Sequence, residues 1–433
     1  MKSFGIRMMV TGLLGLSFFT PSAVLAEETF YTQETQPETN VEQFEVAAAA
    51  AISVDAETGK IFYNQNAEEP LGIASVTKLI SLYLVEKEIE AGRLKWEDTV
   101  EISDYAAALS MNPELSNVPL EKGHAYTVQE LVESLLIQSA NASTVALAEK
   151  IAGSEPKFVD MMRQQLADWD INDAHVVTSS GLNNSDIGEH RYPGTAEDDE
   201  NKLSAKDVAT VAWHLLKEYP DVLKISATPS KMFGENTDMP FEMVNWNQLL
   251  PGNILGKDGV DGLKTGTTDF AGACFVGTMK KDGHRIITVV LNATNQPNDE
   301  NARFVETSKL MDYTFETWKY ETFLDQNSAI PDVKDAQVPE GKEQAVPVVT
   351  QSALQGWVPN DESDIPLATN VKEVQAPAKK GTVVGTVTAA IPDDLGYLTT
   401  EHPEVKTNVI TTQVVEQANL FVRAWRSVTG LFQ

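Results

Sequence analysis

A serine and a lysine three residues apart could supply a nucleophile and its base. Ser75 and Lys78 belong to Ser75-Val76-Thr77-Lys78, which opens an apolar run that predicts a buried helix over 79–89. Residues three apart lie on one helical face, so the Lys78 amine can reach the Ser75 hydroxyl. A serine needs a base to attack a carbonyl, and a neutral lysine can serve. Taken alone, this spacing occurs by chance in most chains of this length.

A second hydroxyl and an amide stand in Ser139-Ala140-Asn141, between helices predicted over 128–137 and 141–151. A serine or asparagine at this point could be an ordinary helix N-cap, which satisfies unpaired backbone N–H groups. The functional interpretation places Ser139 beside the nucleophile and lets Asn141 hold a peptide carbonyl. The spacing alone leaves both interpretations open.

A third set, Lys264-Thr265-Gly266-Thr267, lies on a predicted strand. Gly266 leaves room for a ligand backbone against the strand. Lys264 and Thr265 offer a cation and a hydroxyl, which suit a carboxylate. The alternative is a sheet edge that carries an ordinary lysine.

The three sets follow one another as S-x-x-K, S-x-N and K-T-G, the signature of penicillin-binding proteins and class A β-lactamases. The chain resembles the low-molecular-mass penicillin-binding proteins that are D-alanyl-D-alanine carboxypeptidases (peptidase family S11). Segment 260–278 matches that family well, and 302–307 and 376–388 match more loosely. The resemblance covers about residues 45–433, including a β domain and a terminal helix that β-lactamases lack. An acidic stretch at 186–201 is longer than the family pattern leads us to expect.

The resemblance implies an α+β fold. A penicillin-binding-protein-like catalytic domain, with an antiparallel sheet flanked by helices, precedes a small all-β domain and a C-terminal amphipathic helix. Apolar patterns predict further helices over 203–216 and 303–318, and strands over 263–267, 271–279 and 285–292. The predicted organisation is a signal peptide (1–26), a flexible stretch (27–44), the catalytic domain (45–322), the β domain (323–406) and a membrane-anchoring helix (408–433).

The resemblance also implies a mechanism. Ser75 attacks the carbonyl between the two terminal D-alanines of a peptidoglycan stem peptide, and Lys78 takes its proton. Desolvation and the Lys264 cation would lower the Lys78 pKa enough for this. Backbone N–H groups of Ser75 and Thr267 would stabilise the oxyanion.

The remaining site residues are expected to handle the leaving group and the substrate. Ser139 and Lys264 would relay a proton to the leaving D-alanine, and Asn141 would orient the substrate amide. Thr265 and Arg303 would hold the terminal carboxylate, although Arg303 could instead be a surface charge at a helix start. The resemblance implies no metal and no organic cofactor, and it implies that β-lactam antibiotics acylate the same serine.

The two ends of the chain carry targeting patterns. Lys2 and Arg7 precede an apolar run over 8–19, and small residues precede Glu27, as in a secretory signal peptide. The run is too short to span a bilayer comfortably, and an uncleaved anchor is the alternative.

At the C-terminus, apolar residues recur at helical spacing opposite two arginines. This pattern favours a helix in a membrane interface, with the exported protein held on the outer face of the cell membrane; packing on its own domain is the alternative. The apolar positions are Val414, Ala418, Phe421, Val422, Trp425, Val428 and Phe432.

Composition excludes several other classes of protein. The chain has 63 acidic and 33 basic residues, a formal charge of −30, which argues against a general nucleic-acid binder. One cysteine cannot form an intramolecular disulfide, and no Cys/His spacing predicts a zinc site. The alternatives to a carboxypeptidase are a D,D-endopeptidase or β-lactamase on the same scaffold, and a non-catalytic wall-binding protein. The intact Ser/Lys set counts against the last.

Overall fold

The computed structural model describes residues 44–294, 299, 301–362, 364–391, 395–400 and 404–429. The predicted signal peptide (1–26) and nearly all of the predicted flexible stretch (27–44) lie outside these residues. Within the described ranges, no helix combines the length and the apolar character needed to cross a membrane.

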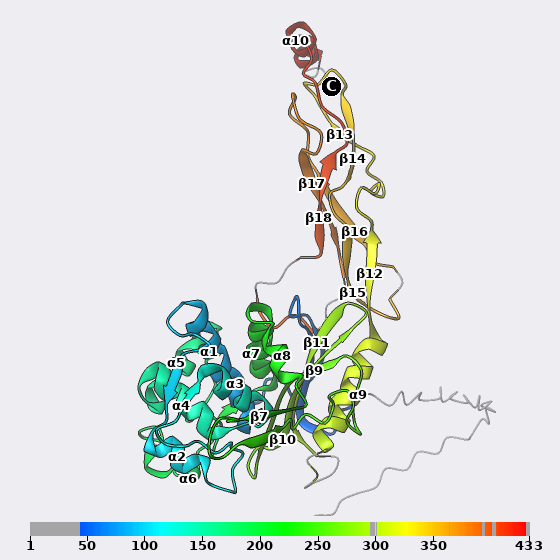
Figure 1. The fold of residues 1–433 in the computed structure, drawn as a ribbon. Helices are drawn as coiled ribbons and strands as arrows, with labels where there is room; N and C mark the ends of the chain where they lie inside the picture. Colours follow the sequence, from blue (N-terminus) through cyan, green and yellow to red (C-terminus); the bar gives the residue numbers. More distant parts are fainter. Residues whose placement is uncertain are drawn as a thin grey trace, which may run out of the picture. The chain divides into compact units, whose positions relative to one another are not determined.

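A five-stranded antiparallel sheet forms the centre of the catalytic part (Figure 1). Its strand order is β2-β1-β11-β10-β9. The predicted strands near the K-T-G set all form and pair as neighbours. The strands are β1 (Ala48–Asp55), β2 (Ile61–Gln65), β9 (Val260–Thr268), β10 (Gly272–Lys281) and β11 (His284–Ala293).

The two faces of this sheet bury alternate residues. On β11, Val289 joins the core under the main group of helices, while Ile286 and Val290 pack toward α9 (Ala302–Thr317). Residues directly opposite each other on antiparallel strands point to the same face. Val289 pairs with Val276 on β10, and Val276 pairs with Lys264 on β9. The register therefore turns Lys264 toward the face of the sheet that packs against the main group of helices, opposite α9.

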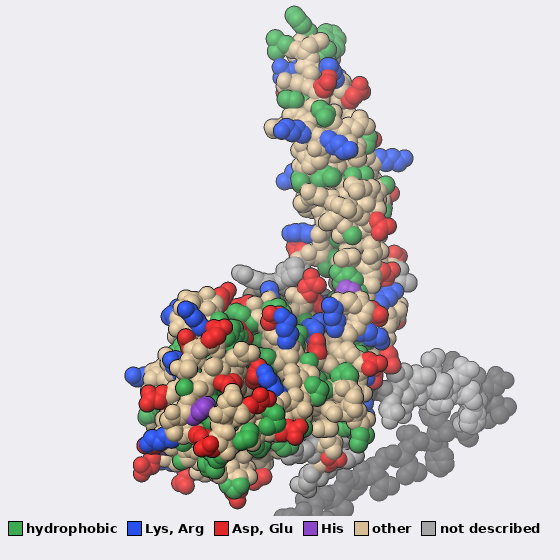
Figure 2. All heavy atoms as spheres, in the orientation of Figure 1, with side chains coloured by type: hydrophobic (Ala, Val, Ile, Leu, Met, Phe, Trp, Pro, Cys, Tyr) green, Lys and Arg blue, Asp and Glu red, His purple; other side chains and the backbone are tan. Residues whose placement is uncertain are grey.

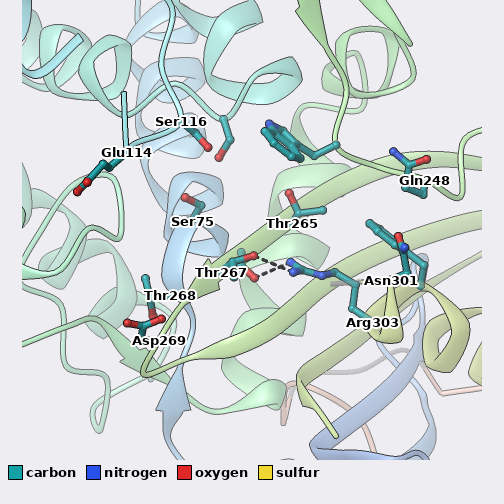
Figure 3. Close-up of a pocket in the computed structure, with 14 residues that line it drawn as sticks. Ser75, Glu114, Ser116, Gln248, Thr265, Thr267, Thr268, Asp269, Asn301 and Arg303 are labelled. Carbon is teal, nitrogen blue, oxygen red and sulfur yellow. Dashed lines mark hydrogen bonds between the residues drawn. The ribbon is translucent and has the colours of Figure 1, made fainter. Parts of the chain in front are cut away.

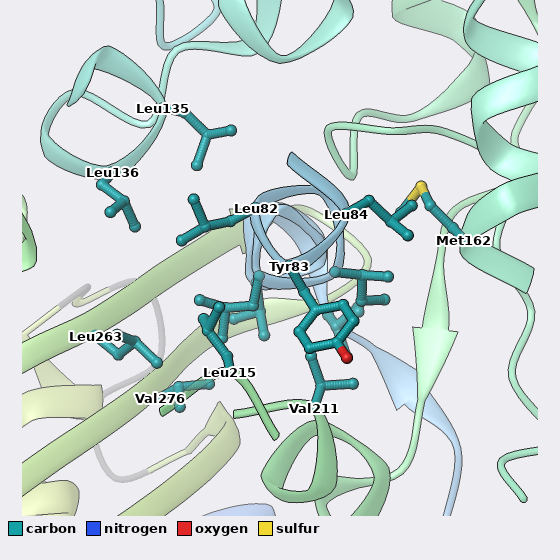
Figure 4. Close-up of a cluster of buried hydrophobic side chains, with 14 of the residues drawn as sticks. Leu82, Tyr83, Leu84, Leu135, Leu136, Met162, Val211, Leu215, Leu263 and Val276 are labelled. Atoms are coloured by element: carbon teal, nitrogen blue, oxygen red, sulfur yellow. The ribbon is translucent and has the colours of Figure 1, made fainter. Parts of the chain in front are cut away.

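The helix α1 (Lys78–Glu90) is buried over most of its length, as its apolar sequence predicts. In Figure 4, Leu82 points toward Leu135 and Leu136, while Leu84 points toward Met162. The surrounding helices are α3 (Val128–Ile137), α4 (Asn141–Ala152), α5 (Glu155–Asp168) and α7 (Ala205–Glu218).

The remaining elements of the catalytic part are short. They are β3 (Leu71–Gly72), η1 (Ala74–Thr77), β4 (Thr99–Glu101), α2 (Asp104–Ser110), β5 (Ala125–Thr127), α6 (Asn184–Ile187), η2 (Gly188–His190), β6 (Lys202–Leu203), α8 (Val222–Ser226), β7 (Ser230–Phe233) and β8 (Phe241–Val244).

The C-terminal part is built from strands and has its own core, which includes Val348, Val387 and Val409. Two strands form one pair, β12 with β15, and five form a sheet in the order β13-β14-β18-β17-β16. Their bounds are β12 (Trp318–Leu324), β13 (Asp335–Gln337), β14 (Ala345–Thr350), β15 (Leu354–Pro359), β16 (Leu367–Val371), β17 (Val383–Ala389) and β18 (Lys406–Thr411).

The terminal helix is shorter than the predicted 408–433, and its start was wrong. Residues 408–411 belong to β18, whose alternate residues Val409 and Thr411 are buried. Ala418 is buried as well, and its N–H donates to the Glu340 carbonyl. The helix α10 is Leu420–Thr429. An apolar residue every fourth position fits both a strand face and a helix face, so the spacing could not locate the junction.

Candidate active site

Ser75 lies on the 3₁₀ turn η1, and Lys78 begins α1 directly after it. The sequence predicted that the S-x-x-K set opens the helix; the turn instead precedes it. The contact between the two residues is retained, because a 3₁₀ turn also aligns residues three apart. Lys78 Nζ lies 2.8 Å from Ser75 Oγ. The residue before the serine, Ala74, has φ +46°, a backbone conformation that is costly for alanine.

The Lys78 amine is enclosed by acceptors. It is fully buried, and it also donates to Asn141 Oδ1 and to the Ser180 carbonyl, both at 2.7 Å. Burial lowers the pKa of Lys78 well below that of a free lysine, and the neighbouring Lys264 charge lowers it further. These are the two causes that the sequence predicted.

Ser139 is held by a lysine and does not cap a helix. Lys264 Nζ donates to Ser139 Oγ at 2.9 Å. The N-cap of α4 is Ala140, which makes no side-chain cap, so the N-cap interpretation is wrong. Ser139 has φ +61°, a second strained residue at the site. Asn141 Nδ2 donates to the Ser116 carbonyl at 3.0 Å, which fixes the amide that faces Lys78.

The strand β9 packs against the turn that carries Ser75. An ideal Cβ on Gly266 would lie 2.6 Å from the Ile73 carbonyl oxygen and 3.2 Å from the Ser75 nitrogen. The space predicted for a ligand backbone is therefore filled by the protein's own turn. Gly266 is required because β9 must approach Ser75 this closely.

Lys264, on β9, and Arg303, on α9, place two basic side chains next to the K-T-G set. Lys264 is buried and also donates to its neighbour's carbonyl, Thr265 O, at 2.9 Å. Burial lowers the pKa of Lys264 to about 7, and Arg303 adds to the shift. Arg303 is 1% exposed, so the surface-charge interpretation is wrong. Its guanidinium donates to Gly266 O at 2.7 Å, and to Thr267 Oγ1 at 2.7 Å.

A cavity of about 660 Å³ opens over these residues (Figure 3). Ser75 and Ser139 line it, whereas Lys78, Asn141 and Lys264 do not. Lys78 contacts the Ser75 hydroxyl, and Lys264 contacts the Ser139 hydroxyl. The lining residues are Ser75, Glu114, Ser116, Ser139, Trp246, Gln248, Thr265, Gly266, Thr267, Thr268, Asp269, Asn301, Arg303 and Phe304.

One part of the site was missed by sequence reasoning. The turn at 179–181 supplies the Ser180 carbonyl to Lys78. Glu155 Oε1 anchors this turn by accepting from Ser179 N at 3.0 Å and from Ser179 Oγ at 2.6 Å. Gly181 has φ +81°, and a Cβ there would lie 1.9 Å from the Ala74 carbonyl oxygen. Two serines and a glycine signal a turn, but a backbone acceptor leaves no side-chain signature.

Other chemistry-bearing residues lie away from this cavity. Among the described residues, no group of three or more His, Cys, Asp or Glu is arranged to hold a metal ion. None of the described histidines lines the cavity, and His402 lies outside the described residues. Cys274 is buried, and burial raises the pKa of its thiol to about 11, as expected for a packing residue.

Comparison with known proteins identifies the family. The model for D-alanyl-D-alanine carboxypeptidase, peptidase S11, matches residues 35–295, more than half of the chain. The chain belongs to this family. It is a serine-type D-alanyl-D-alanine carboxypeptidase, and the predicted α+β fold is confirmed. The model for the C-terminal domain of penicillin-binding protein 5 matches residues 318–417.

Individual relatives of this S11 carboxypeptidase cover most of its length. D-alanyl-D-alanine carboxypeptidase DacF of Bacillus subtilis (strain 168) is 31% identical over 386 residues, 88% of this chain and 89% of the relative. The structure of a peptidoglycan synthesis regulatory factor (PBP3) from Streptococcus pneumoniae is 45% identical, covers 86% of this chain and 100% of its own, and has a TM-score of 0.75.

A third relative bears on ligands. Penicillin-binding protein D2 from Listeria monocytogenes, solved in its ampicillin-bound form, is 28% identical with a TM-score of 0.51. It covers 63% of this chain and 98% of its own.

Proposed function

We propose that this carboxypeptidase removes the terminal D-alanine from peptidoglycan stem peptides through an acyl-enzyme on Ser75, with Lys78 as the base. The arrangement of the amine carries the proposal. A neutral amine has two N–H groups and one lone pair. Asn141 Oδ1 and Ser180 O take the two N–H groups, so the lone pair faces the Ser75 hydroxyl 2.8 Å away.

Acylation then follows from these positions. Ser75 Oγ forms a C–O bond with the carbonyl carbon of the penultimate D-alanine while its proton passes to Lys78 Nζ. The oxyanion lies between the backbone N–H groups of Ser75 and Thr267, which the close approach of β9 to the turn brings together. A preorganised donor of this kind contributes about 3–4 kcal/mol to the transition state.

The D-alanine that leaves needs a proton on its amine nitrogen, and its carboxylate needs a positively charged group to bind it. As the tetrahedral intermediate collapses, the C–N bond breaks and the amine takes a proton through Ser139, which Lys264 contacts at 2.9 Å. The proton that Lys78 accepted from Ser75 replaces it, so Lys78 is neutral again. The Thr265 hydroxyl and the charges of Lys264 and Arg303 favour the carboxylate at this end. Water attacks the ester in the second half-reaction and gives its proton to Lys78. When the ester C–O bond breaks, Lys78 returns that proton to Ser75 Oγ, which restores the hydroxyl.

We assign Asn141 a positioning role in addition to the predicted contact with the substrate amide. Its oxygen accepts from Lys78 and its nitrogen donates to Ser116 O, so it fixes the base. A β-lactam presents a reactive amide to the same serine and acylates it in this proposal. The ampicillin-bound form of the Listeria relative supports that step.

The same proposal places the protein outside the cell, on the membrane surface, held by α10. The polar side of α10 faces the chain itself: Arg426 donates to Gly341 O at 2.6 Å, and Arg423 pairs with Glu340 at 3.2 Å. Its apolar side faces solvent, where Figure 2 shows hydrophobic side chains gathered. Leu420, Phe421 and Trp425 are 69%, 84% and 71% exposed. A helix that turns its apolar side outward fits a membrane interface better than it fits packing on its own domain.

Release of free D-alanine tests the proposed reaction. The wild type should release one D-alanine from a pentapeptide ending in D-Ala-D-Ala, and Ser75→Ala should release none while unfolding at the wild-type temperature. Acylation by benzylpenicillin without any release of D-alanine would contradict the proposal and indicate another substrate, such as an endopeptidase cross-link.

A further inference from the structure

The rim of the active-site cavity carries a large exposed ring. Trp246 lines the cavity and is 44% exposed, whereas its chain neighbours Asn245 and Asn247 are 7% and 3% exposed. Asn245 Nδ2 donates to Ser226 O on α8 at 2.9 Å, and Asn247 Nδ2 donates to Gly262 O on β9 at 3.2 Å. These buried amides fix the backbone on both sides of Trp246, so the ring is held at the rim.

The indole N–H of Trp246 is bound by the protein itself. It donates to the Gln138 carbonyl oxygen at 3.2 Å. Two residues earlier, Val244 at the end of β8 donates its backbone N–H to Gln138 Oε1, also at 3.2 Å. An indole nitrogen can only donate, so it needs an acceptor such as this carbonyl. One short segment therefore holds both the backbone and the side chain of Gln138, the residue directly before Ser139.

Ser139 needs such support because its backbone is strained. Its φ is +61°, and a conformation of this kind persists only where the surrounding structure holds it. On the other side of Ser139, the backbone N–H and the Nδ2 of Asn141 both donate to Ser116 O at 3.0 Å. The contact with Lys264 holds the hydroxyl but not the backbone. The direction in which the hydroxyl enters the cavity therefore depends on Gln138 and Asn141.

We propose that Trp246 is a positioning residue for Ser139, on which it acts through Gln138. The inference rests on the proposed function, in which the C–N bond of the tetrahedral intermediate breaks while the Ser139 hydroxyl gives its proton to the nitrogen of the departing D-alanine. The proton that Lys78 took from Ser75 then restores the Ser139 hydroxyl. Trp246 exchanges no proton in this step and keeps the Ser139 hydroxyl directed at the nitrogen.

Two substrates that differ at the leaving atom isolate this step. The first is Nα,Nε-diacetyl-L-Lys-D-Ala-D-Ala, and the second is the thioester in which sulfur replaces the nitrogen of the last D-alanine. Breaking the C–S bond releases a thiolate, which leaves with its electron pair and needs no proton, whereas the amide nitrogen needs one. Both substrates keep the same methyl group and carboxylate, so weaker binding would lower kcat/KM for both alike.

Trp246→Phe keeps an aromatic ring at the rim and removes the N–H donor. In the full-length enzyme it should lower kcat/KM for the amide about five- to fiftyfold, which is part of the contribution that a general acid makes, and lower kcat/KM for the thioester by less than about twofold. D-Alanine release measures the first value, and thiol release, corrected for hydrolysis without enzyme, measures the second. Trp96→Phe, at a half-buried tryptophan outside this cavity, is the matched control and should leave both values unchanged.

A second variant acts on the same contact from the other side. Gln138→Met removes the acceptor of the Val244 N–H and should also lower kcat/KM for the amide more than for the thioester. If Trp246→Phe unfolds below the assay temperature, this variant decides the question. An unchanged amide value, or an equal loss on both substrates in a folded variant, overturns the positioning role alone. Cleavage of neither substrate by the wild type overturns the proposed function instead.

Discussion

Lys264 changes its charge near neutral pH, because burial and Arg303 lower its pKa to about 7. Below that pH it is an ammonium, and above it the positive charge behind Thr265 is lost. In the Ser75→Ala variant, the Kd for a D-Ala-D-Ala peptide should therefore rise between pH 6 and 8.5, by up to about tenfold per pH unit. Calorimetry would measure this, with the C-terminal amide of the same peptide as control. A Kd for the carboxylate that does not vary with pH contradicts the assigned role.

Arg303 combines a charge with a fixed fork of donors. Arg303→Lys keeps the charge but cannot donate to Gly266 O, Cys274 O and Thr267 Oγ1 together. We expect KM to rise about tenfold or more, with a smaller change in kcat. Arg285→Lys is the matched control, since Arg285 also forms a forked contact, with Asp261. A KM equal to that of wild type would remove Arg303 from substrate binding.

At the scale of elements, two glycines allow a clean comparison. Gly181 and Gly153 have φ of +81° and +78°, so an alanine is strained equally at both. Only Gly181 faces an obstacle, the Ala74 carbonyl oxygen at 1.9 Å, while Gly153 has open space. Gly153→Ala should cost about 1–2 kcal/mol of stability.

Gly181→Ala should cost more than this, and it should also slow acylation at least tenfold, because it displaces both the Ser75 turn and the Ser180 carbonyl. Urea unfolding and penicillin acylation rates measure the two effects. Equal stability and equal acylation in the two variants would show that the turn at 179–181 does not position the nucleophile.

Helices and strands with a regular apolar spacing were predicted from the sequence, and so were the side chains that the structure brings together around Ser75. The helix predicted over 128–137 has the bounds found for α3. The Ser180 carbonyl could not be predicted, because every residue has one and only packing decides which is used. The sequence predicted that Gly266 leaves room for a ligand backbone, whereas the turn at Ser75 fills that room. A glycine in a strand indicates that something packs closely against the backbone, but it does not indicate what. The junction of β18 and α10 was misplaced because the two periods coincide over short runs.

For the whole molecule, the structure places the start of α10 at Leu420, so a deletion can remove this helix alone and test membrane association. Deletion of residues 420–433 spares β18 and should move the protein from the membrane pellet to the supernatant. Phe421→Ser with Trp425→Ser should do the same, and Val414→Ser, an exposed apolar residue outside α10, should not. Unchanged sedimentation of the deletion variant would contradict the anchor.

The account depends on a neutral Lys78 that activates Ser75. The most direct test is the second-order rate constant for acylation of Ser75 by benzylpenicillin, followed by intact-protein mass from pH 5 to 10.5. A base whose pKa is well below that of a free lysine predicts a rate constant that rises with pH and levels off long before pH 10. It also predicts no acylation of folded Lys78→Arg, whose guanidinium stays charged. A rate constant still rising in proportion to hydroxide at pH 10, or a Lys78→Arg variant acylated at the wild-type rate, would contradict it.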